Sequence, residues 1–296
     1  MIYHMNIAIN TDYLTSHGSP EKYIHYISEA GFTHLHWCHQ WNTDFIYSKS
    51  EIAQYKKWLK TYNIKLLDIH GTAGMEKSWF SLEEYQRKAG VELVLNRGRM
   101  LKELDGEGSL MMHTPYLQEI EENPQLKYAK HDAFKKSLDE MLPILEKENI
   151  PIAIENLPKD NYQLLEKTLN EYNTPLIGIT YDSGHGNMGS SIGLDFIERN
   201  KDRLLALHLH DNNQTADQHQ SPFYGTINWT RLAQIIATSS YAKTNFPLSF
   251  ELAMRNTPFY KEEFQVDQPE NDIKLFLQDA YTRCKKVVNL YKSFLK

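Results

Sequence analysis

The chain has 296 residues, of which 41% are hydrophobic and 24% charged, so its composition is that of an ordinary globular protein. The length suffices for one large domain with a substantial core or for two small ones. A formal net charge of -6 gives no general attraction to nucleic acid or to an anionic membrane, although a local basic patch stays compatible with it.

Eight short apolar segments alternate with helical patterns along the chain. Each is predicted to form a strand, and most are apolar on both faces, as in a parallel sheet covered on both sides. In chain order the strands are expected to end near Asn10, His36, His70, His113, Glu155, Asp182, His208 and Glu251.

Segments with apolar residues at helical spacing lie between these strands. The predicted helices cover residues 21–30, 50–63, 81–104, 131–149, 161–173, 228–239 and 271–296. Start signals at Ser19 and Pro20 and a stop signal at Gly31 frame the first of them.

Strand–helix alternation of this kind and length predicts an α/β fold, a single (β/α)8 TIM barrel domain over residues 1–296. An open, doubly wound sheet is the competing arrangement. The GxGxxG pattern that would favour a dinucleotide-binding sheet is absent after the first strand, so the barrel is preferred.

From the third strand onward, every predicted strand ends in a side chain that can bind a metal ion. The six ends are His70, His113, Glu155, Asp182, His208 and Glu251. Barrel enzymes place their chemistry at this edge, and burying six such groups unpaired would be costly. The pattern therefore predicts a metal site at the C-terminal ends of the strands.

Side chains alternate along a strand, which predicts what lies beneath these ends. The residues two positions earlier are small and would form a pocket floor: Ala153, Thr180, Ala206 and Ser249. The residues expected to point outward toward the helices are Ile154, Leu207, Leu209 and Phe250.

Two loops add candidate ligands. YDSGH places Asp182 and His185 three residues apart, across a glycine that would allow a tight turn. LHLHDNNQTADQH places Asp217 and His219 two apart. A single strand-end histidine is more often a hydrogen-bonded pocket residue than a ligand, so only the joint pattern carries the prediction.

IAIEN, YDSGH, LHLHD and SFEL, in this order on the last four strands, resemble the xylose isomerase-like barrel superfamily, which includes sugar isomerases, sugar epimerases and the endonuclease IV family. In the epimerases one divalent metal ion is held by Glu, Asp, His and Glu. The resemblance therefore implies a ligand set of Glu155, Asp182, His208 and Glu251. The wider three-zinc set of the endonuclease IV branch has matches in His70, His113, His185, Asp217 and His219.

Further residues are expected near the pocket as substrate contacts. His36 and Trp37 end the second strand, where a tryptophan can stack on a sugar, although core packing is an equal alternative. His210 and Asp211 are expected to contact the ligands or the substrate. Arg255 follows Glu251 by four residues and would bind a substrate phosphate or cap the barrel edge.

The resemblance implies metal-dependent isomerisation or epimerisation of a sugar or sugar phosphate through an enediolate. Glu155 and Glu251 would be the catalytic base and acid, and His185 would orient a substrate oxygen. The alternative is an endonuclease IV-like multi-zinc phosphodiesterase or phosphoester hydrolase. A third reading, a barrel that only binds sugar or metal, is disfavoured because no ligand position is missing.

Charge counting separates the first two functions. The three carboxylates of Glu155, Asp182 and Glu251 leave about -1 with one divalent ion, which suits a neutral polyol. With Asp217 and three divalent ions the sum is about +2, which suits a phosphate. The cofactor is therefore expected to be one divalent metal ion, with up to three allowed. Zinc, manganese, magnesium and cobalt stay open, and the histidines favour the softer transition metals.

The expected partner is a small-molecule sugar or sugar phosphate. Nucleic acid is not expected, because the strand-end loops are mostly neutral or acidic. No segment reaches the roughly 18 apolar residues of a membrane span, and the start lacks a signal-peptide pattern. With only Cys38 and Cys284, far apart, a cytoplasmic protein without disulfides is expected. The C-terminal helix is a candidate interface for a homo-oligomer.

Overall fold

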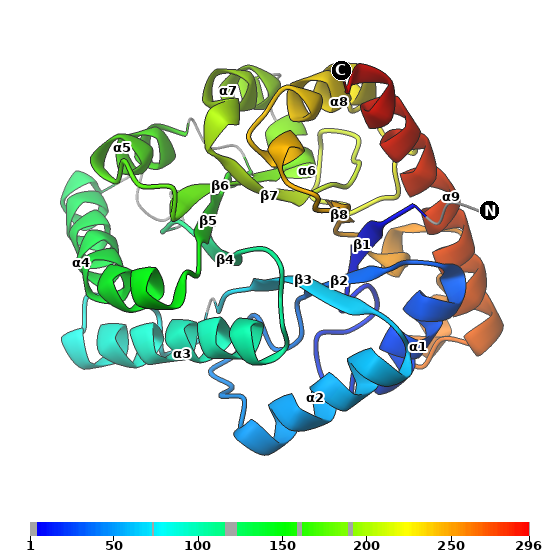
Figure 1. The fold of residues 1–296 in the computed structure, drawn as a ribbon, viewed down its shortest axis with the longest axis horizontal. Helices are drawn as coiled ribbons and strands as arrows, with labels where there is room; N and C mark the ends of the chain where they lie inside the picture. Colours follow the sequence, from blue (N-terminus) through cyan, green and yellow to red (C-terminus); the bar gives the residue numbers. More distant parts are fainter. Residues whose placement is uncertain (1–4, 73, 116–122, 159–161, 189–191, 296) are drawn as a thin grey trace.

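The structure is a computed structural model that describes residues 5–72, 74–115, 123–158, 162–188 and 192–295. Asn161 and Lys296, the outer ends of two predicted helices, lie outside these residues. Eight parallel strands form one sheet with helices around it, as Figure 1 shows. The strands are β1 (Ile7–Asn10), β2 (His34–Trp37), β3 (Lys65–His70), β4 (Leu110–His113), β5 (Ile152–Glu155), β6 (Ile177–Asp182), β7 (Leu204–His208) and β8 (Leu248–Phe250).

The sheet closes on itself. From β1 to β7 each strand pairs with the next one in sequence, and β1 also pairs with β8. Just beyond β7, Leu209 bridges to Phe250, with its N–H 3.0 Å from the carbonyl oxygen of Ser249. The N–H of Glu251 returns a bond of 3.1 Å to Leu209. The predicted (β/α)8 barrel is therefore confirmed over the open-sheet alternative.

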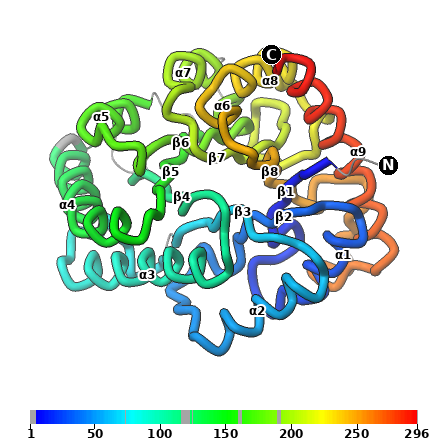
Figure 2. Tube along the Cα trace, viewed as in Figure 1, coloured from blue at the N-terminus to red at the C-terminus, as the bar shows by residue number. Residues whose placement is uncertain are grey.

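Nine α-helices lie in the described part of the chain. They are α1 (Glu21–Ala30), α2 (Lys49–Thr61), α3 (Glu84–Glu103), α4 (Pro124–Glu148), α5 (Gln163–Glu171), α6 (Ser183–Asn187), α7 (Ile192–Asn200), α8 (Trp229–Ala237) and α9 (Glu270–Phe294). Helix α9 packs against both α1 and α8, so the last helix lies beside the pairing of the first and last strands (Figure 2).

Local signals explain several helix ends. Helix α1 stops before Gly31, whose φ of 101° is a left-handed conformation that glycine adopts freely. Helix α4 begins at Pro124 and not at His131, because the Asn123 side chain caps it by accepting from the Leu126 N–H at 3.2 Å. Helix α7 was not predicted from the sequence.

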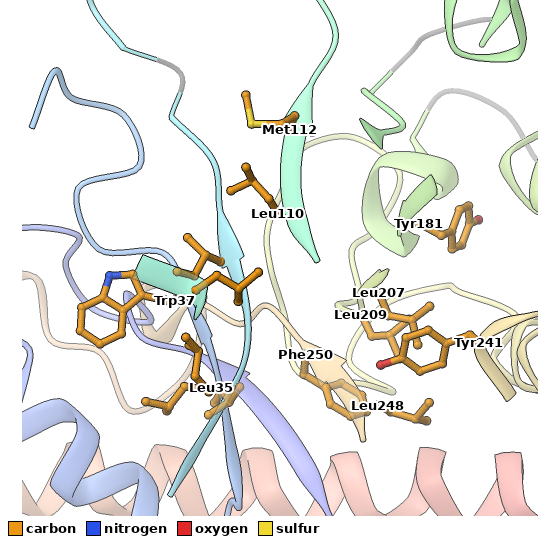
Figure 3. Close-up of a cluster of buried hydrophobic side chains, with 14 of the residues drawn as sticks. Leu35, Trp37, Leu110, Met112, Tyr181, Leu207, Leu209, Tyr241, Leu248 and Phe250 are labelled. Carbon is orange, nitrogen blue, oxygen red and sulfur yellow. The ribbon is translucent and has the colours of Figure 1, made fainter. Parts of the chain in front are cut away.

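The outward-facing side chains of the strands pack into the hydrophobic core. Figure 3 shows Leu207, Leu209 and Phe250 together with Leu248 and Tyr241, all of them buried. Burying each such side chain stabilises the fold by about 1.5–3 kcal/mol. This packing fixes the direction of the alternate side chains, which therefore point into the barrel. No helix in the described residues is long and apolar enough to cross a membrane.

Candidate metal centre

Four side chains from consecutive strands converge at the centre of the barrel mouth. Donor atoms of Glu155, Asp182, His208 and Glu251 all lie within 4.8 Å of one another. The Nδ1 atom of His208 is 2.7 Å from Oε1 of Glu155 and 2.9 Å from Oε2 of Glu251. These are the four residues that the sequence motifs implied as ligands, and the fold brings all of them together. We call them the central cluster.

The electrostatics of the central cluster match a cation site. Burial by itself would raise the pKa of Glu155, but His208 and His113 hold that pKa well below its usual value. Burial likewise disfavours the imidazolium of His208, yet Glu251 and Glu155 raise the pKa of His208 well above its usual value. The carboxylates of Glu155 and Glu251 thus meet at one nitrogen of His208, and the carboxylate of Asp182 lies beside them. A divalent cation would balance these three negative charges, so the donor set fits a metal ion.

A second cluster contains His70, His113 and Glu155, whose donor atoms also lie within 4.8 Å of one another. Nε2 of His113 is 2.8 Å from Oε2 of Glu155. Nδ1 of His70 is 2.7 Å from the carbonyl oxygen of Gly71 and must be its donor, which leaves Nε2 as an acceptor. Burial and neighbouring His113 lower the pKa of His70 well below its usual value, so the ring is in the neutral form that binds metals.

A third cluster contains His185, Asp217 and His219. Oδ2 of Asp217 is 3.2 Å from Nε2 of His185 and 3.0 Å from Nε2 of His219. Nδ1 of His185 lies 3.0 Å from the backbone carbonyl of Asn156, and Nδ1 of His219 lies 3.2 Å from that of Glu251. Burial would lower the pKa of His219, but Asp217 and Glu251 raise it to about 10. The same histidines hold the pKa of Asp217 below its usual value against burial. All nine predicted ligands therefore fall into three adjoining clusters.

The YDSGH motif leads into a helix and not into the tight turn expected from the sequence. Its last three residues, from Ser183 to His185, begin the short helix α6. The Asp182 carboxylate at the end of β6 caps this helix and accepts from the N–H of His185 at 2.6 Å. Gly184 does not serve a tight turn. It is required for space, because a Cβ atom at this position would overlap the imidazole of His210.

Asp211 organises the loop that carries Asp217 and His219. Its carboxylate is fully buried and accepts four hydrogen bonds of 2.9 to 3.1 Å. The donors are the backbone N–H groups of Asn212, Phe223 and Ile227 and the indole of Trp229. The backbone of Asp211 also exchanges two bonds with Gln220. Both oxygens are thereby occupied, so Asp211 holds the loop and does not contact a substrate.

The residues at the end of β2 divide between two environments. His36 is fully buried, with Nδ1 2.7 Å from Oδ1 of Asp68 and its ring centre 4.3 Å from that of His208. Trp37 points to the other side of the sheet, where its indole donates to the hydroxyl of Tyr47 at 3.0 Å. Only 1% of Trp37 is exposed. Of the two alternatives for Trp37, the structure shows core packing, because strand alternation sends the residue after His36 into the core.

Of the two other expected substrate contacts, His210 is buried and Arg255 is exposed. His210 is buried, places Nε2 2.9 Å from Oδ1 of Asp182 and stacks on His219 with ring centres 4.0 Å apart. It therefore supports two candidate ligands. Arg255 is exposed, and its guanidinium lies 5.9 Å from the ring centre of Tyr260. A substrate contact at Arg255 stays a prediction.

Two supporting residues escaped the sequence analysis. Asn156 donates from Nδ2 to the carbonyl of Asp182 at 2.9 Å and accepts from its N–H at 2.8 Å. Asp68 anchors His36. Both had a signal, because Asn156 directly follows Glu155 and Asp68 stands two residues before His70, on the same strand face.

Comparison with known proteins identifies the family of the chain. Residues 24–272 match the profile of the xylose isomerase-like TIM barrel family, and the chain belongs to this family. It is 27% identical over 250 residues to the uncharacterized protein y4fM of Sinorhizobium fredii, covering 77% of this chain and 79% of that one.

Solved structures share the barrel. A D-tagatose 3-epimerase-like protein superposes with a TM-score of 0.73 at 18% identity, covering 98% of this chain and 99% of that chain. A D-psicose 3-epimerase, solved in the presence of D-fructose, superposes with a TM-score of 0.74 at 15% identity, covering 96% and 99%. At these identities the likeness establishes the fold.

Proposed function

We propose that the protein is a divalent-cation-dependent isomerase or epimerase of a sugar or sugar phosphate. One observation carries the proposal: the carboxylates of Glu155 and Glu251 reach the same nitrogen of His208 from β5 and from the end of β8. Two carboxylates that approach one centre from separate strands are the arrangement that proton exchange at a substrate carbon needs.

The roles are those that the family resemblance implies for the residues of the central cluster. Glu155, Asp182, His208 and Glu251 would hold the cation. A bound divalent ion would polarise two adjacent substrate oxygens and acidify the carbon that carries one of them. Glu155 and Glu251 exchange protons with that carbon, one as base and the other as acid, through an enediolate of the substrate. His185, at the edge of this cluster, orients a substrate oxygen.

The structural relatives support the same class. The proteins described as D-tagatose 3-epimerase-like and D-psicose 3-epimerase share the barrel over nearly their whole length. The fold by itself does not define a reaction. The support therefore lies in the combination of this barrel with a complete Glu, Asp, His and Glu cluster at the ends of its last four strands.

A second candidate function is phosphoester hydrolysis. It is favoured by the two clusters that adjoin the central one, since Glu155 belongs to both the central and the second cluster. Such an arrangement suits two or three cations acting on one phosphate. The net charge of -6 disfavours a nucleic-acid substrate, so a small phosphoester is the form of this alternative that fits best.

The test measures proton exchange directly. Chelator-treated protein is reconstituted with Mn²⁺, Co²⁺ or Zn²⁺ and incubated with ketoses in deuterated water, and deuterium at the carbon is followed by NMR. Exchange that requires Glu251 but survives His70→Ala supports the isomerase, because His70 belongs to the second cluster only. Hydrolysis of an aryl phosphodiester that is lost in both variants, without any exchange, would favour the hydrolase.

A further inference from the structure

A fourth group of donor atoms lies beside the central cluster, on the β1–β2 side of the barrel mouth. A ring nitrogen of His36, the sulfur of Cys38 and a carboxylate oxygen of Glu251 lie within 4.8 Å of one another. His36 and Cys38 are both fully buried, and the Glu251 side chain is 12% exposed. The nine ligands considered so far include only Glu251 from this group.

His36 is oriented as a ligand. Its Nδ1 atom lies 2.7 Å from Oδ1 of Asp68, so Nδ1 carries the proton and Nε2 presents a lone pair. Within the described residues, Nε2 of His36 is buried and has no hydrogen-bond partner. A carboxylate behind a histidine is the arrangement that fixes the ring and strengthens it as a metal ligand.

Three other histidines of the clusters show the same orientation. His70, His185 and His219 each place Nδ1 on a backbone carbonyl, at 2.7, 3.0 and 3.2 Å respectively. Nε2 is then the nitrogen left to face a cluster. His36 repeats this pattern, with the carboxylate of Asp68 in place of a carbonyl.

Cys38 is held in position from the first strand. Its N–H donates to Oγ1 of Thr11 at 3.0 Å. Burial and the neighbouring carboxylate of Asp12 raise the pKa of its thiol well above the usual value. Asp12 accepts from Nδ2 of Asn10 at 2.8 Å. The same Asn10 amide pairs with the backbone of Leu252, next to Glu251, through bonds of 2.8 and 3.1 Å. The network thus ties Cys38 and Glu251 to one scaffold.

We propose that His36, Cys38 and Glu251 form an additional cation site for a zinc-like divalent ion. The site shares Glu251 with the central cluster, just as the second cluster shares Glu155. Nitrogen, sulfur and carboxylate oxygen are the donors that zinc takes in proteins, whereas magnesium takes oxygen. The thiol proton leaves to solvent when the ion binds. A cation at this position would pin Glu251 and make the protein prefer soft divalent ions over hard ones.

Cobalt titration tests this proposal. Full-length protein, stripped with a chelator, is titrated with Co²⁺, and thiolate ligation is read from the near-ultraviolet thiolate-to-cobalt charge-transfer band. We expect the band in the unaltered protein and in Cys284→Ser. In Cys38→Ser we expect the band to disappear and the protein to bind one ion fewer per chain. Cys284 is the matched control, because it is also fully buried and is the only other cysteine, in α9.

The anchoring carboxylate gives an independent readout. Asp68→Asn is expected to weaken cobalt binding at the Cys38 site, as read from the thiolate band, about 10- to 100-fold. Cobalt ions bound elsewhere, which give no thiolate band, should bind as before. Cys38→Ala repeats the test without a hydroxyl, and thermal melting of each variant confirms that it folds.

The failure of this proposal is distinct from failure of the proposed function. A cobalt-saturated protein without a thiolate band, or a band that survives Cys38→Ser, overturns the additional site whether or not the protein is active. A Cys38-dependent band in a protein that exchanges no sugar proton supports the site and counts only against the proposed function.

Discussion

The loop that carries Asp217 and His219 depends on one buried carboxylate, and its removal should be measurable. In Asp211→Asn the side chain keeps one oxygen but turns the other into an NH2 group. Oδ1 of Asp211 accepts from Asn212 and Ile227, and Oδ2 accepts from Phe223 and from the indole of Trp229. Whichever oxygen is replaced, two donors lose their acceptor and face another donor.

The magnitude follows from the number of bonds lost. A hydrogen bond to a charged group contributes about 1.5–3 kcal/mol, so losing two should lower the free energy of unfolding by about 3–6 kcal/mol. If the loop detaches instead, the loss should be smaller, and any cation bound by the third cluster should be lost. Urea denaturation of the chelated protein and metal analysis of the reconstituted protein distinguish these outcomes.

Trp229→Phe is the matched control. It removes one donor and leaves three on Asp211, so a loss of about 1.5–3 kcal/mol is expected from the missing bond. Because both variants act on one network, the double variant should be less destabilised than the sum of the two. An Asp211→Asn protein with unchanged unfolding free energy and unchanged cation content would refute the assignment of Asp211 as the organiser of this loop.

Other predictions concern the cation clusters. Glu155→Gln and Glu251→Gln should each lower turnover about 10²- to 10⁴-fold without changing the circular dichroism spectrum, and near-normal epimerisation in either variant would contradict the acid–base roles. Because the pKa of His219 is raised from 6.5 to about 10, its pairing with Asp217 stabilises the cation-free protein below pH 6.5 and is lost as the pH rises toward 10. The melting temperature of chelated protein should therefore fall across this range, and His219→Asn should lack that part of the slope. At pH 7 cation binding should release protons from His208 and His219, whose pKa values are raised, which calorimetry in buffers of different ionisation enthalpy detects.

The positions of the principal ligands were predictable from local pattern. In a parallel barrel all strands end at one rim, and side chains alternate along each strand, so polar residues that end apolar runs must meet there. β3 to β7 end at the residues that the sequence predicted, from His70 to His208. The same alternation explains why Trp37, which was expected near the pocket, lies in the core: it follows the inward-facing His36 by one residue.

What the sequence determined by itself is therefore the barrel, the rim at which its strands end and the nine candidate ligands. Only the tertiary structure decided how these ligands divide into clusters, because each cluster joins strands and loops that are distant in the chain. The meeting of Cys38 with Glu251 arises in the same way. Asn10 and Leu252 are bonded only because β1 pairs with β8, and local pattern carries no record of a contact that barrel closure creates.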